Sequence, residues 1–197
     1  ALRACLDRVD GVLYTHHHAD HVLGLDELRI FGFVHEISIP LYGLPDTMDA
    51  IRHTFEYAFD DHAHGVPRID LNTIDGPFNL RGVHVIPIPV LHDRITISAY
   101  RIGNFAYVTD CSAIPEASAE MLHGVDILVI GALKRNTHPK HFSLDEALFE
   151  IERLKAGSAY LTHLSHEFEH EELERELPEN VHVAYDGLVL EADEPLT

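Results

Sequence analysis

The chain has 197 residues, enough for a substantial hydrophobic core, and its 46% apolar and 24% charged residues are ordinary for a globular protein. A formal charge of −19 with only 14 Lys and Arg disfavours a nucleic-acid-binding protein, because a surface that binds a polyanion needs many cations. No apolar run is long enough to span a membrane, and Cys5 and Cys111 are too few for a disulfide framework or a four-cysteine zinc site, which favours free thiols in the cytoplasm.

The first half of the chain is predicted to mix short strands with helices, from its apolar spacing and its turn residues. In chain order we expect the end of a helix over 1–8, a strand over 11–15, a helix over 25–31, a strand over 37–42 and a helix from Pro45 to about residue 59.

The second half is predicted to begin with strands and then to alternate helices with strands. We expect strands over 69–74, 83–90, 95–102, 105–109, 126–130, 159–162, 181–184 and 188–191, and helices over 114–123, 143–155 and 169–176. Ser143 to Glu146 forms a capping box that opens the second of these helices. This order predicts a layered α/β fold, and the lack of a linker or repeat predicts a single domain over 1–197.

Four metal-ligand residues lie close together in the segment Thr15-His16-His17-His18-Ala19-Asp20-His21. In an extended segment alternate side chains share a face, so His16 and His18 can hold one ion while His17 points elsewhere. Asp20 and His21, past the bend, would face a second ion. A lone histidine is usually structural, but this group at the end of a strand predicts a metal site.

Three later strands are each followed by a metal-ligand residue, namely His92, Asp110 and His163. Each alone is as readily explained as a polar residue at a strand end. Together they form an ordered set with the first group, which strengthens the prediction of a metal site.

The His-x-His-x-Asp-His pattern resembles the signature of the metallo-β-lactamase superfamily, whose later ligands are a His, a bridging Asp and a last His, in the order found here. The resemblance implies a four-layer αββα sandwich, which periodicity alone does not distinguish from other α/β folds. In that superfamily several strands precede the signature, whereas about one helix precedes it here. We therefore expect this chain to lack the first strands of the first sheet.

The same resemblance implies a pair of divalent ions. His16, His18 and His92 would hold one ion, Asp20, His21 and His163 the other, and Asp110 would bridge them. Imidazole-rich ligation favours zinc, and the carboxylates are also compatible with manganese or iron. Such a site would carry about one positive charge, which favours a small anionic substrate, and a bridging hydroxide would be the nucleophile.

The segments 136–148, 161–166 and 184–187 resemble the phosphodiesterase branch of the superfamily. That branch includes the phosphoribosyl cyclic phosphodiesterase of the carbon-phosphorus lyase pathway and, more distantly, resembles the tRNA 3′-processing endonucleases. The resemblance implies that His141 donates a proton to the leaving oxygen, with a neutral ring near the start of a helix; alternatively, His138 and His141 only shape a turn. His138 and Lys140 are candidates for substrate binding, although Lys140 is equally well explained as a solvated charge.

Two positions depart from the branch. Some relatives use the residue at His166, with N-terminal cysteines, to hold a structural zinc, but this chain lacks those cysteines. We expect one of three roles for His166: it has no function in metal binding, it supports another metal ligand, or it binds a metal only together with a missing segment. Relatives also tend to carry Asp where this chain has Gly131, which weakens the transfer of mechanism if that Asp orients a ligand or the catalytic histidine.

We therefore expect a dinuclear metal-dependent hydrolase, a phosphodiesterase acting on a small cyclic or nucleotide-like phosphodiester, in which Asp20 orients the nucleophile. Alternatives on the same scaffold are a tRNA 3′-processing nuclease, which the charge disfavours, and a thioester, lactone or β-lactam hydrolase. A non-catalytic metal-binding or sensor domain is an alternative from another class. We expect a cytoplasmic protein that binds neither membrane nor nucleic acid. A homodimer is compatible with the sequence.

Overall fold

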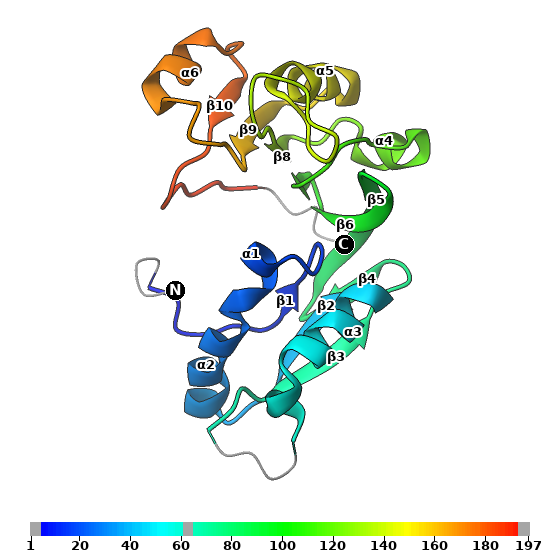
Figure 1. Cartoon of the computed structure of the whole chain (residues 1–197), viewed down its shortest axis with the longest axis vertical. Helices are drawn as coiled ribbons and strands as arrows, with labels where there is room; N and C mark the ends of the chain where they lie inside the picture. Colours follow the sequence, from blue (N-terminus) through cyan, green and yellow to red (C-terminus); the bar gives the residue numbers. More distant parts are fainter. Residues whose placement is uncertain (1–4, 61–64, 193–197) are drawn as a thin grey trace. The chain divides into compact units, whose positions relative to one another are not determined.

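The computed structural model describes residues 5–60 and 65–192 (Figure 1). The chain forms two compact units, Ala1–Val83 and His84–Thr197. The expectation of a single domain stays a prediction. Among the described residues, no helix is both long and apolar enough to cross a lipid bilayer.

The first unit is built on a parallel sheet of three strands in the order β1-β2-β3. Leu41 of β2 lies opposite Val12 on one side and Leu71 on the other. Because parallel neighbours need crossover connections, helical segments join these strands. The elements are β1 (Val12–Leu13), α1 (Ala19–Val22), η1 (Leu23–Glu27), α2 (Leu28–His35), β2 (Ile39–Gly43), α3 (Pro45–Thr54), η2 (Glu56–Phe59), β3 (Ile69–Thr73) and β4 (Phe78–Leu80).

Alternating apolar residues of β2 anchor the core of this unit. Ile39 and Leu41 are fully buried and pack with Ile51 of α3 and Leu25 of η1. The amide of Tyr14 donates to the carbonyl of Tyr42, which continues the pairing of β1 by one residue. The chain therefore leaves the sheet directly before the histidine-rich segment.

The second unit holds a larger sheet whose strands follow the order β10-β9-β8-β7-β6-β5. β5, β6 and β7 are antiparallel, whereas β7, β8, β9 and β10 are parallel. The elements are β5 (Val83–His92), β6 (Ile95–Ile102), β7 (Phe105–Val108), α4 (Glu116–Leu122), β8 (Ile127–Gly131), α5 (Leu144–Leu154), β9 (Ser158–Thr162), α6 (His170–Glu176) and β10 (Val181–Val183).

The parallel strands bring their carboxyl ends to one edge of the sheet. Val108 of β7 pairs with Ile130 of β8, which pairs with Leu161 of β9. The residues that follow these strands, Asp110 and His163 among them, therefore leave the sheet at the same edge. The end of β5 is tied to the segment after β7, because the amide of Ser112 donates to the carbonyl of Leu91.

The predicted capping box at the start of α5 is confirmed. The hydroxyl of Ser143 accepts from the amide of Glu146, and the Glu146 carboxylate accepts from the amide of Ser143 at 2.8 Å. Ala147, Ile151 and Leu154 bury the inner face of this helix in the core. The loop between β8 and α5 is therefore held in place where it joins the helix.

Several local predictions were wrong. Residues 5–8 are not helical, and Leu6 is 55% exposed; residues 1–4 lie outside the described part. The strand predicted over 188–191 is absent, and Val189 is 80% exposed. The short elements α1 and β4 were not predicted, because two to four residues show no clear periodicity.

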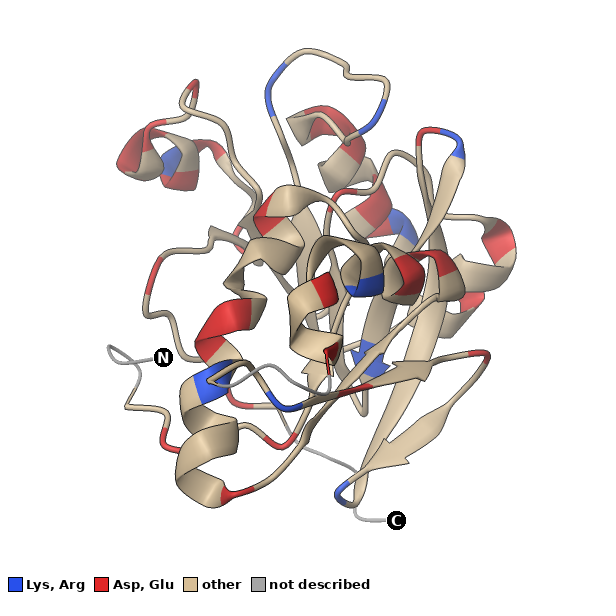
Figure 2. Cartoon of the chain, turned by 60° about the horizontal axis from the view of Figure 1, so that its bottom comes forward, with Lys and Arg blue, Asp and Glu red and all other residues tan. Residues whose placement is uncertain are grey.

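Acidic residues dominate the charged surface, as the composition of 33 Asp and Glu against 14 Lys and Arg implies. Figure 2 marks acidic residues in red on helices and loops of both units, with fewer basic residues in blue.

Candidate metal centre

The first group of candidate ligands follows β1 in the first unit. Nε2 of His16 lies 3.0 Å from Nδ1 of His18, and the ring of His17 between them is exposed. Ligand atoms about 2.1 Å from one ion lie roughly 3 to 3.5 Å from each other, so this pair has the spacing of two ligands. The structure thus brings His16 and His18 together and leaves His17 exposed.

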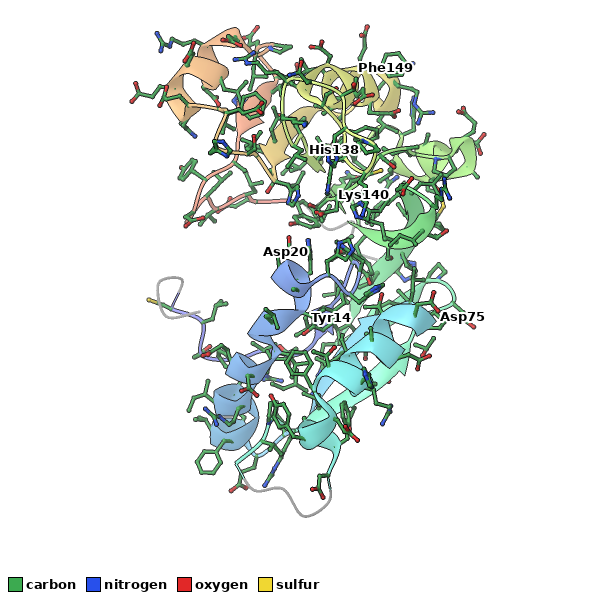
Figure 3. All side chains as sticks on the ribbon, in the orientation of Figure 1. Tyr14, Asp20, Asp75, His138, Lys140 and Phe149 are labelled. Carbon is green, nitrogen blue, oxygen red and sulfur yellow. The ribbon has the colours of Figure 1, made fainter. Side chains whose placement is uncertain are left out.

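The short helix α1 returns the next two candidates to the same place. The carbonyl of His18 accepts from the amide of His21 at 3.0 Å, and the His21 ring centroid lies 4.2 Å from that of His16. Asp20, whose side chain is 63% exposed, places Oδ2 3.4 Å from Nε2 of His21. Figure 3 shows Asp20 on α1. The spacing of the four ligands in the His-x-His-x-Asp-His signature therefore has a structural cause. The first two lie at the end of a strand, and the last two lie on the helical turn that follows.

In the second unit, Asp110 is the centre of the other group. Its side chain is 2% exposed, and Oδ2 lies 3.4 Å from Nε2 of His163 and 3.7 Å from Nδ1 of His141. Asp110 and His163 have φ of 54° and 57°, a left-handed conformation that is uncommon outside glycine and is found at functional sites. A buried carboxylate among imidazole rings fits a divalent cation, which would offset the cost of burying its charge.

His92, the last residue of β5, is held by two backbone carbonyls. Its Nδ1 lies 2.6 Å from the carbonyl oxygen of Asp110 and 3.0 Å from that of Lys140. Because a carbonyl only accepts, the ring proton belongs on Nδ1, which donates, and Nε2 keeps its lone pair. Histidine ligands in metal sites are typically oriented in this way, by a hydrogen bond from the ring nitrogen that does not bind the metal.

His141 lies among the rings of His92, His138 and His163, with centroid distances of 4.8, 5.2 and 4.9 Å. Burial lowers the pKa of His141 to about 4, although the Asp110 carboxylate acts in the opposite direction and the other rings add to the lowering. This direction agrees with the neutral ring expected from the sequence. Its main cause is burial rather than the nearby helix terminus.

Two threonine hydroxyls orient candidate ligands, and sequence reasoning missed both. Oγ1 of Thr15 lies 3.1 Å from Nδ1 of His16, and Oγ1 of Thr109 donates to Oδ1 of Asp110 at 2.7 Å. A signal was present in the sequence, because Thr directly precedes a candidate ligand at three strand ends, Thr162 being the third. Such partners fix a ligand and tune its basicity.

The remaining candidates lie at different distances from these groups. His138 is half-buried beside His141, and Lys140 is exposed; both are on the loop between β8 and α5 (Figure 3). His166 is exposed and belongs to none of the groups of potential metal ligands found among the described residues. Its role stays a prediction.

Gly131 lies at the end of β8, between the strands that lead to Asp110 and His163. A Cβ at this position would lie 3.2 Å from the amide nitrogen of Asp110 and 3.8 Å from Cβ of His163. Any side chain would therefore press on the backbone of Asp110. Glycine at position 131 therefore allows the backbone of Asp110 to lie close to the end of β8.

The family model described as Beta-lactamase superfamily domain matches residues 1–164, and the chain belongs to this family. It therefore has the α/β fold and the hydrolase scaffold of the metallo-β-lactamase superfamily, as predicted.

Three similar proteins refine this placement. A crystal structure described as a diphosphatase from the PhnP family is 40% identical, covers 100% of this chain and 77% of that chain, and has a TM-score of 0.92. The short form of human tRNase Z is 19% identical, covers 99% of this chain and 83% of that chain, and has a TM-score of 0.73, which shows a shared fold. An octanoyltransferase of Porphyromonas gingivalis is 35% identical over 98% of this chain, which spans 40% of that protein. The predicted membership of the phosphodiesterase branch is confirmed.

Proposed function

We propose that the chain is a dinuclear metal-dependent hydrolase that cleaves a small cyclic or nucleotide-like phosphodiester. The observation that carries the proposal is the 40% identity to a diphosphatase over the whole of this chain. That relative is described as a diphosphatase, and paired metal ions can promote the hydrolysis of both phosphodiesters and diphosphates.

The donor atoms of the chain are of the kinds that hold divalent ions. His16 and His18 have the spacing of paired ligands, and Asp110 is buried beside imidazole nitrogens. The superfamily pattern assigns His16, His18 and His92 to one ion, Asp20, His21 and His163 to the other, and Asp110 to both. This set of seven ligands, five of them imidazoles, favours zinc or manganese.

Bound ions of this kind supply Lewis acidity and lower the pKa of a shared water molecule to about 7. In the proposal, Asp20 orients the attacking oxygen, and its exposed carboxylate is free to reach solvent. His141 faces the leaving oxygen, and its neutral ring donates a hydrogen bond to that oxygen through its one N–H. His138 and Lys140, on the same loop, contact the phosphate.

The identity to a diphosphatase also supports a second candidate, the hydrolysis of a small diphosphate. A tRNA-processing role is disfavoured, because the net charge of −19 opposes a polyanionic substrate. Octanoyl transfer is not carried over from the P. gingivalis protein, since this chain spans 40% of it.

Parallel assays of one preparation separate these candidates. The metal-loaded full chain is expected to hydrolyse bis-p-nitrophenyl phosphate faster than a nucleoside diphosphate, a thioester, a lactone or a β-lactam. Each rate is compared with that of the same ions in buffer. Phosphodiester turnover no faster than this background would refute the proposal, and faster turnover of another substrate would assign the chain to that class instead.

A further inference from the structure

A second set of donor atoms converges within the second unit alone. One ligand atom each from His92, Asp110 and His141 lie within 4.8 Å of one another. Nδ1 of His141 is fully buried, has no hydrogen-bond partner among the described residues, and lies 3.7 Å from Oδ2 of Asp110. A buried, unsatisfied nitrogen is costly, and a cation beside the carboxylate would remove that cost.

The backbone holds these three residues together. The ring of His92 contacts the carbonyls of Asp110 and Lys140, and Lys140 directly precedes His141. On the other side of His141, the amide of Phe142 donates to the carbonyl of Cys111 at 2.7 Å. His141 is therefore fixed from both sides against the segment that carries Asp110, which is the arrangement expected of a preorganised ligand.

The donor atoms of the three residues suit one ion. Thr109 donates to Oδ1 of Asp110, so Oδ2 is the oxygen that faces the imidazoles. The carbonyl contacts of His92 place its proton on Nδ1 and its lone pair on Nε2. Two imidazole nitrogens and one carboxylate oxygen form a common ligand set for a catalytic zinc ion, which keeps further positions open. To lie about 2.1 Å from one ion, the donor atoms must each move by about 1 Å, which rotation of the side chains allows.

We infer that His141 is itself a metal ligand, which binds one divalent ion through Nδ1 together with His92 and Asp110. This inference rests on the metal binding in the proposed function and not on its substrate. It also fixes the ring proton of His141 on Nε2, so that the nitrogen that donates a hydrogen bond to the leaving oxygen and the nitrogen that binds the metal are different atoms. The superfamily pattern gives His141 no such ligand role.

Nuclear magnetic resonance of the full chain, with 15N-labelled histidine and bound 113Cd²⁺, tests this assignment directly. The Nδ1 resonance of His141 is identified by its loss in His141→Ala and its retention in His123→Ala, a substitution at an exposed histidine after α4. We expect one-bond coupling between 113Cd and this resonance, and Co²⁺ affinity at one site at least about tenfold lower in His141→Ala and His141→Gln than in the parent and in His123→Ala.

The outcomes separate the two proposals. Coupling of 113Cd to other histidines without coupling to His141 would overturn the ligand assignment and leave the proposed hydrolase intact. A chain that binds no metal would refute both. Coupling to His141 in a protein that does not hydrolyse phosphodiesters would support the ligand assignment and refute only the proposed substrate.

Discussion

Replacing Asp110 with Asn is expected to lower kcat/KM for phosphodiester hydrolysis by more than about 100-fold and to weaken metal binding by a similar factor. Loss of a residue that merely supports a ligand costs 10 to 100-fold, so loss of the carboxylate that is proposed to bridge the two ions is expected to cost more. The amide keeps the shape of the side chain and an oxygen for the Thr109 hydroxyl, which donates to Oδ1 at 2.7 Å. Activity and metal content measured on the same sample check the prediction.

The matched control is Asp93→Asn. Asp93 also has a left-handed φ, of 56°, but it is exposed and lies in the turn after β5. This variant is expected to keep its activity and its metal. After chelation, Asp110→Asn is expected to unfold at the same temperature as the chelated parent or at a higher one, because a buried charge has been removed. Normal activity in Asp110→Asn would contradict its assignment as a ligand.

Replacing His18 with Ala is expected to remove one ion and most of the activity, whereas replacing its neighbour His17 is expected to change either by no more than about twofold. Nδ1 of His18 lies 3.0 Å from Nε2 of His16, while the ring of His17 is exposed. The difference follows from alternation along an extended segment.

Metal content by mass spectrometry and turnover of bis-p-nitrophenyl phosphate are measured for His17→Ala and His18→Ala in parallel. Because the two variants delete the same atoms from adjacent positions, general damage to the segment would lower both alike. Equal losses in the two variants would therefore count against the face that His16 and His18 share.

Local signals predicted the fold best. The capping box of Ser143 and Glu146 placed the start of α5, and the apolar β-branched run before Gly131 placed β8. These features depend on neighbours within one turn or one strand. The strand predicted over 188–191 failed because its alternation has no partner strand on the outer side of β10 in the described sheet.

The sequence identifies candidate residues for the site but not the contacts between them. Thr-ligand pairs and strand ends mark His16, Asp110 and His163 in the sequence. The contacts of the His92 ring with carbonyls 18 and 48 positions away depend on the register of the sheet and on the path of a loop, which no local pattern encodes. The nearness of Nδ1 of His141 to Asp110 has the same origin.

Elemental analysis of the freshly purified, folded chain tests the central claim most directly, since every assigned role depends on bound cations. The account predicts two divalent ions per chain, zinc or manganese, either present on purification or taken up after addition of either metal. Folded protein that carries no transition metal, and stays unloaded when zinc or manganese is supplied, would contradict it.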